Sequence, residues 1–391
     1  MTRFTGGNRI DLLHCGAEYF PALLAAIDGA EREIFLESYI FADDETGRNV
    51  AAALEHAARR GCAVRVLVDG FGARHFPQTF GPSLQQAGAQ YLIYRAEIAP
   101  FILRRYRLRR LHRKLVAIDG KIAFIGGINI IADDNTPPGI GPSLDYAVRI
   151  EGPLLAPILS TMRRAWETVA WVSFKRHYRL PDDRPLQAQP AGNQRAAFLL
   201  RTSLRHRDNI ANAYLEAILM AKESVLLANA YFLPGWRFRR ALTAAARRGI
   251  RVTLLVQGKS DHALWHYAAQ ALYDKLTRVG VRVFEYRQGF LHAKVAVIDR
   301  QWATVGSSNI DPFSLFLAKE SNIAVLDGHF ARQLEDSLLT AIHEGATEHG
   351  VKPQTPLSRL LRWLCYGLVR LLADIAGYGH WHRPPGRSGK G

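Results

Sequence analysis

The stretch LHRKLVAID (Leu111–Asp119) decides the fold, because a near copy of it, LHAKVAVID (Leu291–Asp299), occurs later in the same chain of 391 residues. Each copy is a run of aliphatic and β-branched residues that ends at an aspartate. Such a run is typical of a short buried strand. The two copies are therefore the first sign that the chain repeats itself.

Two further blocks repeat upstream of these strands, in the same order. AARRGCAVRVLVDG (Ala57–Gly70) matches AARRGIRVTLLVQG (Ala245–Gly258), and each reads as a helix end, a glycine stop and a buried strand. The apolar runs EIFLESYIF and SVLLANAYFLP, which start at Glu33 and Ser224, precede them. Three matched blocks in one order indicate a duplicated α/β unit.

The duplication predicts the domain organisation. We expect an α/β fold made of two similar halves, residues 1–180 and 197–345, each with a largely parallel or mixed sheet covered by helices. A stretch rich in Pro, Gln and Asp over residues 181–196 is expected to link them. Residues 346–391 are expected to form a C-terminal tail outside the duplicated core.

Composition narrows the function classes. About half of the chain (48%) is apolar, which suits a folded protein, and the formal net charge of +16 favours an anionic partner. Nucleic acid, an anionic membrane surface and phosphorylated substrates all remain open on charge alone. The three scattered cysteines predict neither a disulfide framework nor a zinc ribbon. The sequence has no secretory leader and no run of eighteen uncharged apolar residues, so we expect no membrane span.

The repeated strands carry the candidate chemistry in the pattern H-x-K-x4-D, followed by a small pair and an asparagine. The first copy consists of His112, Lys114, Asp119, Gly126, Gly127 and Asn129, and the second of His292, Lys294, Asp299, Gly306, Ser307 and Asn309. Residues two apart in a strand share a face, so the histidine and lysine of each copy point together. The aspartates lie an odd number of steps away and cannot share that face. Asp119 and Gly120 form a hairpin signal, and the returning strand could bring each asparagine alongside the histidine.

Such a face suits phosphoryl chemistry. Imidazole can attack phosphorus, a lysine neutralises the phosphate oxygens, and the amides of Asn129 and Asn309 and the Ser307 hydroxyl can donate to those oxygens. The alternative, that a histidine and a lysine merely sit at a sheet edge, is reasonable for one copy. It is much less so for two copies within a duplicated unit.

The doubled motif resembles that of the phospholipase D superfamily. The blocks NRIDLL, AFIGGINI, DYAVRIEGP, NAYFLPG and WATVGSSNIDPFS are also similar to the bacterial cardiolipin synthases of the B type, over roughly residues 8 to 345. The resemblance implies two α/β/α halves that meet at a pseudo-twofold axis, so that both motifs build one site.

The resemblance also implies roles for the residues. His112 becomes the nucleophile that carries the phosphatidyl group, and His292 the acid and base. Asp119 and Asp299 belong to the motif but are structural in the family. Asp145 and Glu320 match an acid that orients a motif histidine. Gly127 departs from the family pattern, which often has serine there, so the first half lacks one hydroxyl donor.

Three features lie outside the motifs. FILRRYRLRR (Phe101–Arg110) is a basic and aromatic insertion directly before the first motif, where we expect it at the mouth of the site, although a solvated loop is the alternative. Residues 358–379 read as an amphipathic helix with a basic face, suited either to a membrane surface or to the protein's own core. His262 and His266 have helical spacing but no third ligand nearby, so we expect no metal and no cofactor.

The sequence thus predicts a cardiolipin synthase on the cytoplasmic face of a bacterial cell membrane, acting on phosphatidylglycerol and an anionic membrane surface. The expected reaction transfers a phosphatidyl group from one phosphatidylglycerol to another through a phosphohistidine and releases glycerol. A hydrolytic phospholipase D or a nuclease on the same site is the first alternative, although no nucleic acid is expected. A non-catalytic membrane scaffold is the second. The sequence leaves acceptor choice and oligomeric state open.

Overall fold

The computed structural model describes residues 2–95, 110–180, 186, 188–202, 206, 208–258, 263–311, 318–350 and 367. The first half contains β1 (Thr5–His14), α1 (Cys15–Asp28), β2 (Glu33–Ser38), α2 (Glu45–Arg59), β3 (Ala63–Asp69), α3 (Phe76–Thr79), α4 (Gly81–Gln86), β4 (Gln90–Tyr94), β5 (Arg110–Leu111), β6 (Leu115–Ile118), β7 (Ile122–Gly126), β8 (Ser143–Leu144), β9 (Tyr146–Glu151) and α5 (Leu155–Val172).

The second half repeats this order with few changes. It contains β10 (Gln194–Arg201), α6 (Asn209–Met220), β11 (Ser224–Asn229), α7 (Trp236–Arg247), β12 (Arg251–Gln257), α8 (Ala263–Thr277), β13 (Arg282–Tyr286), β14 (Phe290–Leu291), β15 (Lys294–Ile298), β16 (Trp302–Gly306), β17 (Ala318–Leu326), α10 (Gly328–Gly345) and β18 (Ala346–Glu348).

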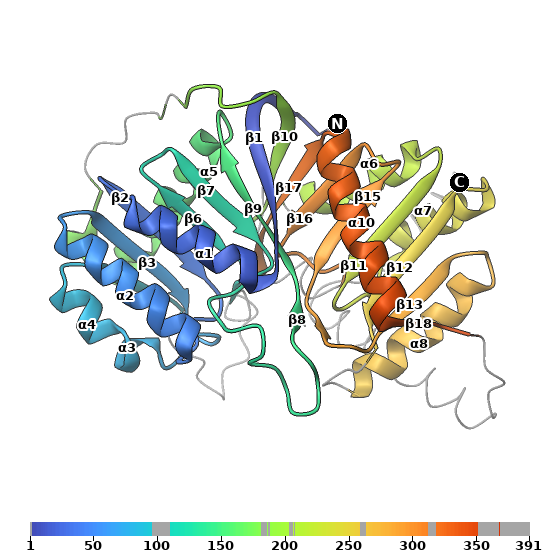
Figure 1. Ribbon diagram of the computed structural model, residues 1–391, viewed down its shortest axis with the longest axis horizontal. Helices are drawn as coiled ribbons and strands as arrows, with labels where there is room; N and C mark the ends of the chain where they lie inside the picture. The colour runs from blue at the N-terminus through green and yellow to red at the C-terminus, as the bar shows by residue number, and fades with distance from the viewer. Residues whose placement is uncertain are drawn as a thin grey trace, which may run out of the picture.

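One mixed sheet runs through both halves (Figure 1). The first half contributes the order β4-β3-β2-β6-β7-β9-β1, and the second half contributes β13-β12-β11-β15-β16-β17-β10. The two orders correspond strand for strand, and β1 and β10 pair antiparallel where the halves meet. This arrangement confirms the expected α/β fold of two similar halves about a pseudo-twofold axis. β18 adds to the outer edge beside β13, so the sheet extends three residues past the expected end of the second half at residue 345.

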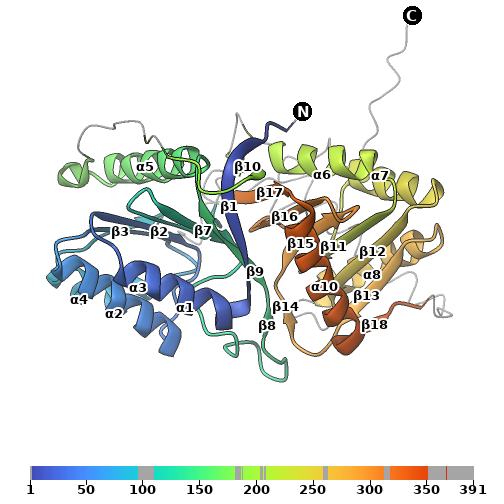
Figure 2. The same ribbon diagram turned by 45° about the horizontal axis from the view of Figure 1, so that its top comes forward.

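Helices cover both faces of the sheet. Figure 2 shows α5, α6 and α7 on one side, and α1, α2 and α10 on the other. Helices that correspond in the duplication, such as α1 and α6 or α5 and α10, thus fall on opposite faces. The β-strands are buried on both sides, and this is why they read as continuous apolar runs rather than as alternating patterns.

The repeated block AARRG has the same structural role in both halves. Gly61 and Gly249 adopt left-handed backbone conformations with φ of 92° and 84°, which end α2 and α7. The arginine before each glycine reaches the end of the preceding helix. Nη2 of Arg60 donates to the carbonyl of Asp28 at 2.9 Å, and Nη2 of Arg248 donates to that of Ala221 at 3.2 Å. The block therefore fixes two helix ends at once in each half.

The motif strands form the predicted hairpins. β6 pairs antiparallel with β7, and β15 with β16, across three-residue loops. Asp119 and Gly120 have φ of 54° and 65°, and Asp299 and Arg300 have φ of 53° and 52°. Both loops thus use the left-handed region, which a glycine enters more easily than an arginine.

Candidate active site

The two motifs meet because each motif strand pairs with a strand from the other half. β5 pairs parallel with the start of β17, and β14 pairs parallel with β8. The N–H of His112 donates to the carbonyl of Lys319 at 3.0 Å, and that of His292 donates to the carbonyl of Leu144 at 2.9 Å. β8 lies at the lower centre of Figure 1, so this meeting point lies towards the lower side of the molecule.

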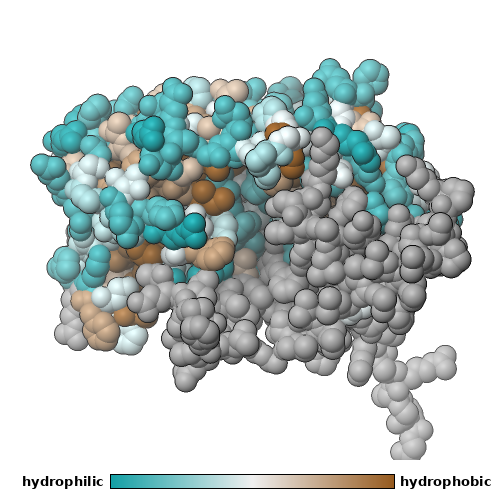
Figure 3. Space-filling model, turned by 90° about the horizontal axis from the view of Figure 1, so that it is seen from below, coloured by the Kyte–Doolittle hydropathy of each residue, from teal (hydrophilic) through white to brown (hydrophobic). Residues whose placement is uncertain are grey.

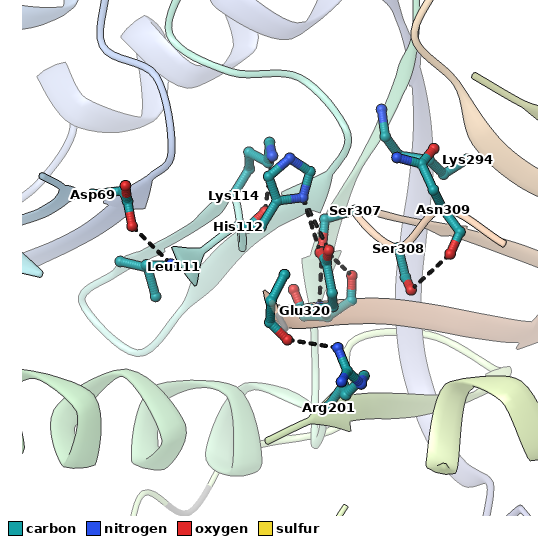
Figure 4. Close-up of polar contacts among 12 residues, drawn as sticks. Asp69, Leu111, His112, Lys114, Arg201, Lys294, Ser307, Ser308, Asn309 and Glu320 are labelled. Carbon is teal, nitrogen blue, oxygen red and sulfur yellow. Dashed lines mark hydrogen bonds and ion pairs between the residues drawn. The ribbon is translucent and has the colours of Figure 1, made fainter. Parts of the chain in front are cut away.

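Each motif histidine contacts a buried carboxylate from the opposite half. Nδ1 of His112 lies 3.1 Å from Oε2 of Glu320 (Figure 4). Nδ1 of His292 lies 2.6 Å from Oδ2 of Asp145. The histidine side chains are 18% and 20% exposed, whereas Glu320 and Asp145 are buried. A neutral imidazole that faces a carboxylate through Nδ1 carries its proton there, which leaves the Nε2 lone pair for a reaction. Asp145 and Glu320 thus lie beside the motif histidines, as expected, and each acid contacts the histidine of the other half.

Burial keeps the imidazoles uncharged at neutral pH. It lowers the pKa of His112, against the opposing charge of Glu320. It also lowers the pKa of His292 to about 4, where the charge of Lys294 adds to the effect and Asp145 opposes it through its charge and its hydrogen bond. An anionic phosphodiester would offset the lysines and favour a proton on one imidazole.

The two motif lysines bring positive charge to the same place. Nζ of Lys114 donates to the carbonyl of His112 at 2.8 Å, and Nζ of Lys294 donates to that of His292. Figure 4 shows both lysines close to His112. Burial lowers the pKa of Lys114 to about 7, and it also lowers the pKa of Lys294. The charge of Lys294 also lowers the pKa of Lys114, because like charges repel in a buried site.

The motif position occupied by Gly127 in the first half and by Ser307 in the second differs for a steric reason. The Ser307 hydroxyl donates to Oε2 of Glu320, and Figure 4 shows this contact beside His112. At Gly127, a Cβ atom would lie 2.2 Å from Oδ1 and 2.6 Å from Cγ of Asp145. The shorter carboxylate of Asp145 fills the place that a serine side chain would need. Glycine at this position is therefore matched to aspartate, and serine to glutamate.

The asparagines are buried at the ends of the returning strands. Oδ1 of Asn129 accepts the N–H of Ile40 at 3.1 Å. Figure 4 shows Asn309 beside Lys294, and Asn309 is 5% exposed. Asn309 thus lies beside a motif lysine, as the hairpin prediction requires, and the role of both asparagines as phosphate ligands stays a prediction.

Asp119 and Asp299 lie apart from this group of motif side chains. They lie at the far ends of the motif strands, and each carboxylate binds three consecutive backbone N–H groups. Asp119 binds those of residues 31–33 at 2.8–2.9 Å, and Asp299 binds those of residues 222–224 at the same distances. They tie the motif hairpin to the start of β2 or β11, so their function is structural, as the odd spacing from the histidines indicates.

Sequence reasoning missed two residues whose side chains accept backbone hydrogen bonds just before the motif histidines. Oδ2 of Asp69 accepts the N–H of Leu111 at 2.9 Å, and Oε1 of Gln257 accepts the N–H of Leu291 at 2.6 Å. The sequence did carry a signal for them, because Asp69 and Gln257 occupy the same place, before the final glycine, in the matched blocks RVLVDG and TLLVQG. Tyr39 was also missed, and its ring centroid lies 4.9 Å from that of His112.

Several expectations fall outside the described residues. Of Phe101–Arg110 only Arg110 is described, and of the amphipathic segment 358–379 only Gly367. His262 and the side chain of His266 are also outside the described part. Within the described part, no three His, Cys, Asp or Glu side chains gather in a way that could hold a metal ion. No helix there is long and apolar enough to cross a membrane.

Comparisons with known proteins cover both halves. A family model described as "Cardiolipin synthase, PLD-like domain" matches residues 23–156 and 214–341. Cardiolipin synthase B of Escherichia coli K12 is 42% identical, over 97% of this chain and 92% of that protein. Cardiolipin synthase A of Pseudomonas syringae is 32% identical, over 94% of this chain and 75% of that protein.

Solved structures show the same fold at low identity. The crystal structure of phosphatidylserine synthase from Haemophilus influenzae has 13% identity and a TM-score of 0.66, with 94% of each chain covered. Polyphosphate kinase from Porphyromonas gingivalis has 17% identity and a TM-score of 0.57, with 93% of this chain and 53% of the kinase covered. At these identities the likeness concerns the fold alone.

Proposed function

The chain belongs to the cardiolipin synthases with a phospholipase D-like domain and is a phosphatidyltransferase, and from this premise we propose that it joins two molecules of phosphatidylglycerol into cardiolipin. The observation that carries the proposal is the single site in which His112 and His292 face crossed carboxylates, with both motif lysines beside them. Such a site offers a nucleophile, a proton carrier and positive charge for one phosphodiester.

The proposed reaction has two balanced steps. In the first, Nε2 of His112 attacks the phosphorus of one phosphatidylglycerol. The bond from phosphorus to the glycerol oxygen breaks, and His292 gives that oxygen a proton, so glycerol leaves. In the second, a headgroup hydroxyl of another phosphatidylglycerol attacks the phosphorus, the phosphorus–nitrogen bond breaks, and His292 takes the hydroxyl proton. The covalent route divides one slow displacement into two easier ones.

The surrounding residues are proposed to support both steps. Lys114, Lys294, Asn129 and Asn309 would hold the phosphate oxygens, whose charge is greatest in the transition state. Ser307, whose one hydroxyl proton goes to Glu320, would instead keep that carboxylate in place. Glu320 and Asp145 would keep each imidazole in the tautomer with Nε2 facing the phosphorus.

We place the enzyme on the cytoplasmic face of a bacterial cell membrane, with the tail 346–391 and the basic segment before Arg110 as membrane contacts. The formal net charge of +16 supports attraction to anionic lipid. Figure 3 shows the lower face of the molecule, where hydrophobic residues lie between hydrophilic ones in the described part. A face of this kind suits a headgroup layer.

The direct test is incubation of the purified chain with phosphatidylglycerol vesicles, with the lipid products identified by mass. Cardiolipin and free glycerol are expected in equal amounts. Phosphatidic acid as the main product would favour the hydrolytic alternative, and cleavage of oligonucleotides at a comparable rate would favour a nuclease.

The roles of the two histidines are tested with a lipid whose leaving group needs no proton, such as phosphatidyl-p-nitrophenol. His112→Ala and His292→Ala should both abolish turnover of phosphatidylglycerol. On the activated lipid, His292→Ala should release p-nitrophenol and keep the phosphatidyl group on the protein. His112→Ala should do neither. The opposite pattern would exchange the two roles.

A further inference from the structure

Arg110 and Tyr39 lie beside His112 in the first half, and the second half has no equivalent pair. We propose that these two side chains form a second anion subsite, which binds the phosphate of the acceptor lipid while its hydroxyl attacks at His112. The inference rests on the proposed function and adds to it the group by which the acceptor is chosen.

Arg110 shares a strand face with the nucleophile. It lies two residues before His112 on the segment that pairs with β17, so its Cα is about 6.6 Å from that of His112 on the same side of the strand. Tyr39 follows β2, and its ring lies against His112 and under the ammonium of Lys114, with Nζ 5.5 Å from the ring centroid. Both side chains therefore border the place where the reacting phosphate would lie.

The electrostatics place Arg110 and Tyr39 near each other. Burial raises the pKa of Tyr39 to about 12, the charge of Asp69 raises it further, and the charge of Arg110 opposes the rise. The phenol thus keeps its proton at neutral pH and serves as a donor. A guanidinium and a phenol together are suitable donors for a phosphate group.

Arg110 keeps donors for a ligand. Its Nη1 lies 3.8 Å from Oδ1 of Asp69 and 3.5 Å from the carbonyl of Arg95, and its guanidinium lies over the ring of Phe71 at 5.4 Å. The Asp69 carboxylate is itself shared among three backbone N–H groups, those of Leu111, Phe71 and Gly72. Asp69 therefore orients the guanidinium and neutralises its charge only in part.

The pseudo-symmetric positions in the second half are apolar. The pairings of β5 with β17 and of β14 with β8 set Phe290 opposite Arg110 in the duplication, and the strand register sets Ala230 opposite Tyr39. Phe290 stacks on His292 with ring centroids 5.9 Å apart, and Ala230 is buried. Of these pseudo-symmetric positions, the one on the His112 side carries a cation and its counterpart on the His292 side does not.

The chemistry of the product explains why a second subsite is useful. Cardiolipin holds two phosphates joined by a three-carbon glycerol, and one of them is the reacting phosphate at His112. The other belongs to the acceptor and lies a few bonds away. Water and simple alcohols have no second phosphate, so a cation at this distance favours a phosphorylated acceptor over them.

The experiment is a competition between acceptors. The full chain receives phosphatidylglycerol vesicles with ethanol, and the ratio of cardiolipin to phosphatidylethanol is read by mass. Arg110→Gln should lower this ratio about tenfold or more, because a hydrogen bond from a charged donor is lost. Arg110→Lys should restore part of the ratio. Tyr39→Phe should lower the ratio by a few fold and covers the case in which Arg110→Gln does not fold.

A soluble pair of acceptors separates phosphate recognition from the lipid surface. Glycerol 3-phosphate and glycerol differ by the phosphate alone, so the wild type should prefer the former and Arg110→Gln should lose most of that preference. Arg282→Gln is the matched control, because it removes the same charge from an exposed arginine on β13. Its ratio should equal that of the wild type.

Two results overturn the inference, and they differ from failure of the proposed function. If Arg110→Gln leaves both ratios unchanged, or lowers both products equally, Arg110 does not read the acceptor. If the wild type makes phosphatidylethanol but no cardiolipin, the proposed function is wrong and the subsite has no acceptor to bind.

Discussion

The side chains packed behind the segment that carries His112 are charged, whereas the equivalent side chains behind His292 are apolar. Arg113, between the first motif's histidine and lysine, is 2% exposed, and its Nη2 lies 2.8 Å from Oε2 of Glu37, which is equally buried. Lys319 completes this group, because its charge lowers the pKa of Glu37. The pseudo-symmetric residues are Ala293, Ala228 and Leu144, all buried within one apolar core.

The difference shows which part of the duplication is constrained. The backbone pairings, the histidine–carboxylate contacts and the strand-end acceptors at Asp69 and Gln257 recur in both halves. The side chains behind the strand do not. Both histidines are thus held in the same way, whereas the side chains that support their strands differ. Support by ion pairs and support by apolar packing respond differently to substitution.

The largest expected effect is on stability, and it comes from breaking the ionic group. Arg113→Ala leaves the Glu37 carboxylate buried without its closest cation, which should cost about 3–5 kcal/mol of unfolding free energy. The midpoint of urea unfolding of the full chain measures it.

Replacing the whole group should undo most of that loss. The triple variant Glu37→Leu, Arg113→Met, Lys319→Leu imitates the apolar support behind His292 at similar volume, and such replacements are often neutral. A triple variant that is less stable than Arg113→Ala would show that the two kinds of support are not interchangeable.

The next effect concerns the pairing of Gly127 with Asp145. Gly127→Ser places a side chain within contact distance of the Asp145 carboxylate and should displace it from His292. Turnover should fall on the order of 100-fold, because an imidazole without its orienting carboxylate loses the correct tautomer. The measured quantity is kcat on a short-chain, monomeric phosphatidylglycerol.

The second half supplies the matched control. Ser307→Gly removes only the hydroxyl that donates to Glu320, so kcat should fall by about tenfold or less. The double variant Gly127→Ser, Asp145→Glu copies the second-half pair and should recover part of the lost activity. If kcat falls more in Ser307→Gly than in Gly127→Ser, the first half does not require glycine here for the steric reason given.

The repeated blocks predicted the duplicated α/β fold and both motifs, because strand and helix-end signals are local in sequence. The resemblance to the phospholipase D superfamily also pointed to Asp145 and Glu320 as orienting acids, a role that stays a prediction. It could not show that each acid serves the histidine of the other half, because the β5–β17 and β8–β14 pairings join segments far apart in the chain. Gly127 was visible as a departure from the pattern, but its cause, the carboxylate of Asp145, is a matter of packing.

Arg113 illustrates a second limit. In sequence, an arginine between a histidine and a lysine looks like part of a basic surface. Its burial depends on Glu37, which lies on a neighbouring strand and has no charged counterpart in the second half. Ion pairs across strands follow from register, and register is set by the whole sheet.

A smaller effect should appear in the pH dependence, where the two lysines differ in surroundings. The pKa of Lys114 is about 7, so above that pH the ammonium that we propose to bind phosphate is progressively lost. Above pH 7, loss of this proton should therefore add a fall in kcat/KM of up to about tenfold per pH unit. Lys114→Arg stays charged at every accessible pH and should remove this added fall. A steep fall that persists in Lys114→Arg would come from another group.

The smallest expected effect tests why the first half has an aspartate where the second half has a glutamine. The charge of Asp69 raises the pKa of Lys114, although burial lowers it more. Asp69→Asn keeps an oxygen that can accept from Leu111 and removes the charge, so the pKa of Lys114 should fall. Because Lys114 then loses its proton at lower pH, the steep part of the kcat/KM profile should move to lower pH by a fraction of a unit. Gln257→Glu adds a charge at the position that is pseudo-symmetric to Asp69. It should shift the high-pH fall of kcat/KM less than Asp69→Asn does. Both variants are compared with the wild type on monomeric phosphatidylglycerol, where membrane charge does not enter. An unchanged profile in Asp69→Asn would mean that Asp69 acts on the site through the backbone of Leu111 alone.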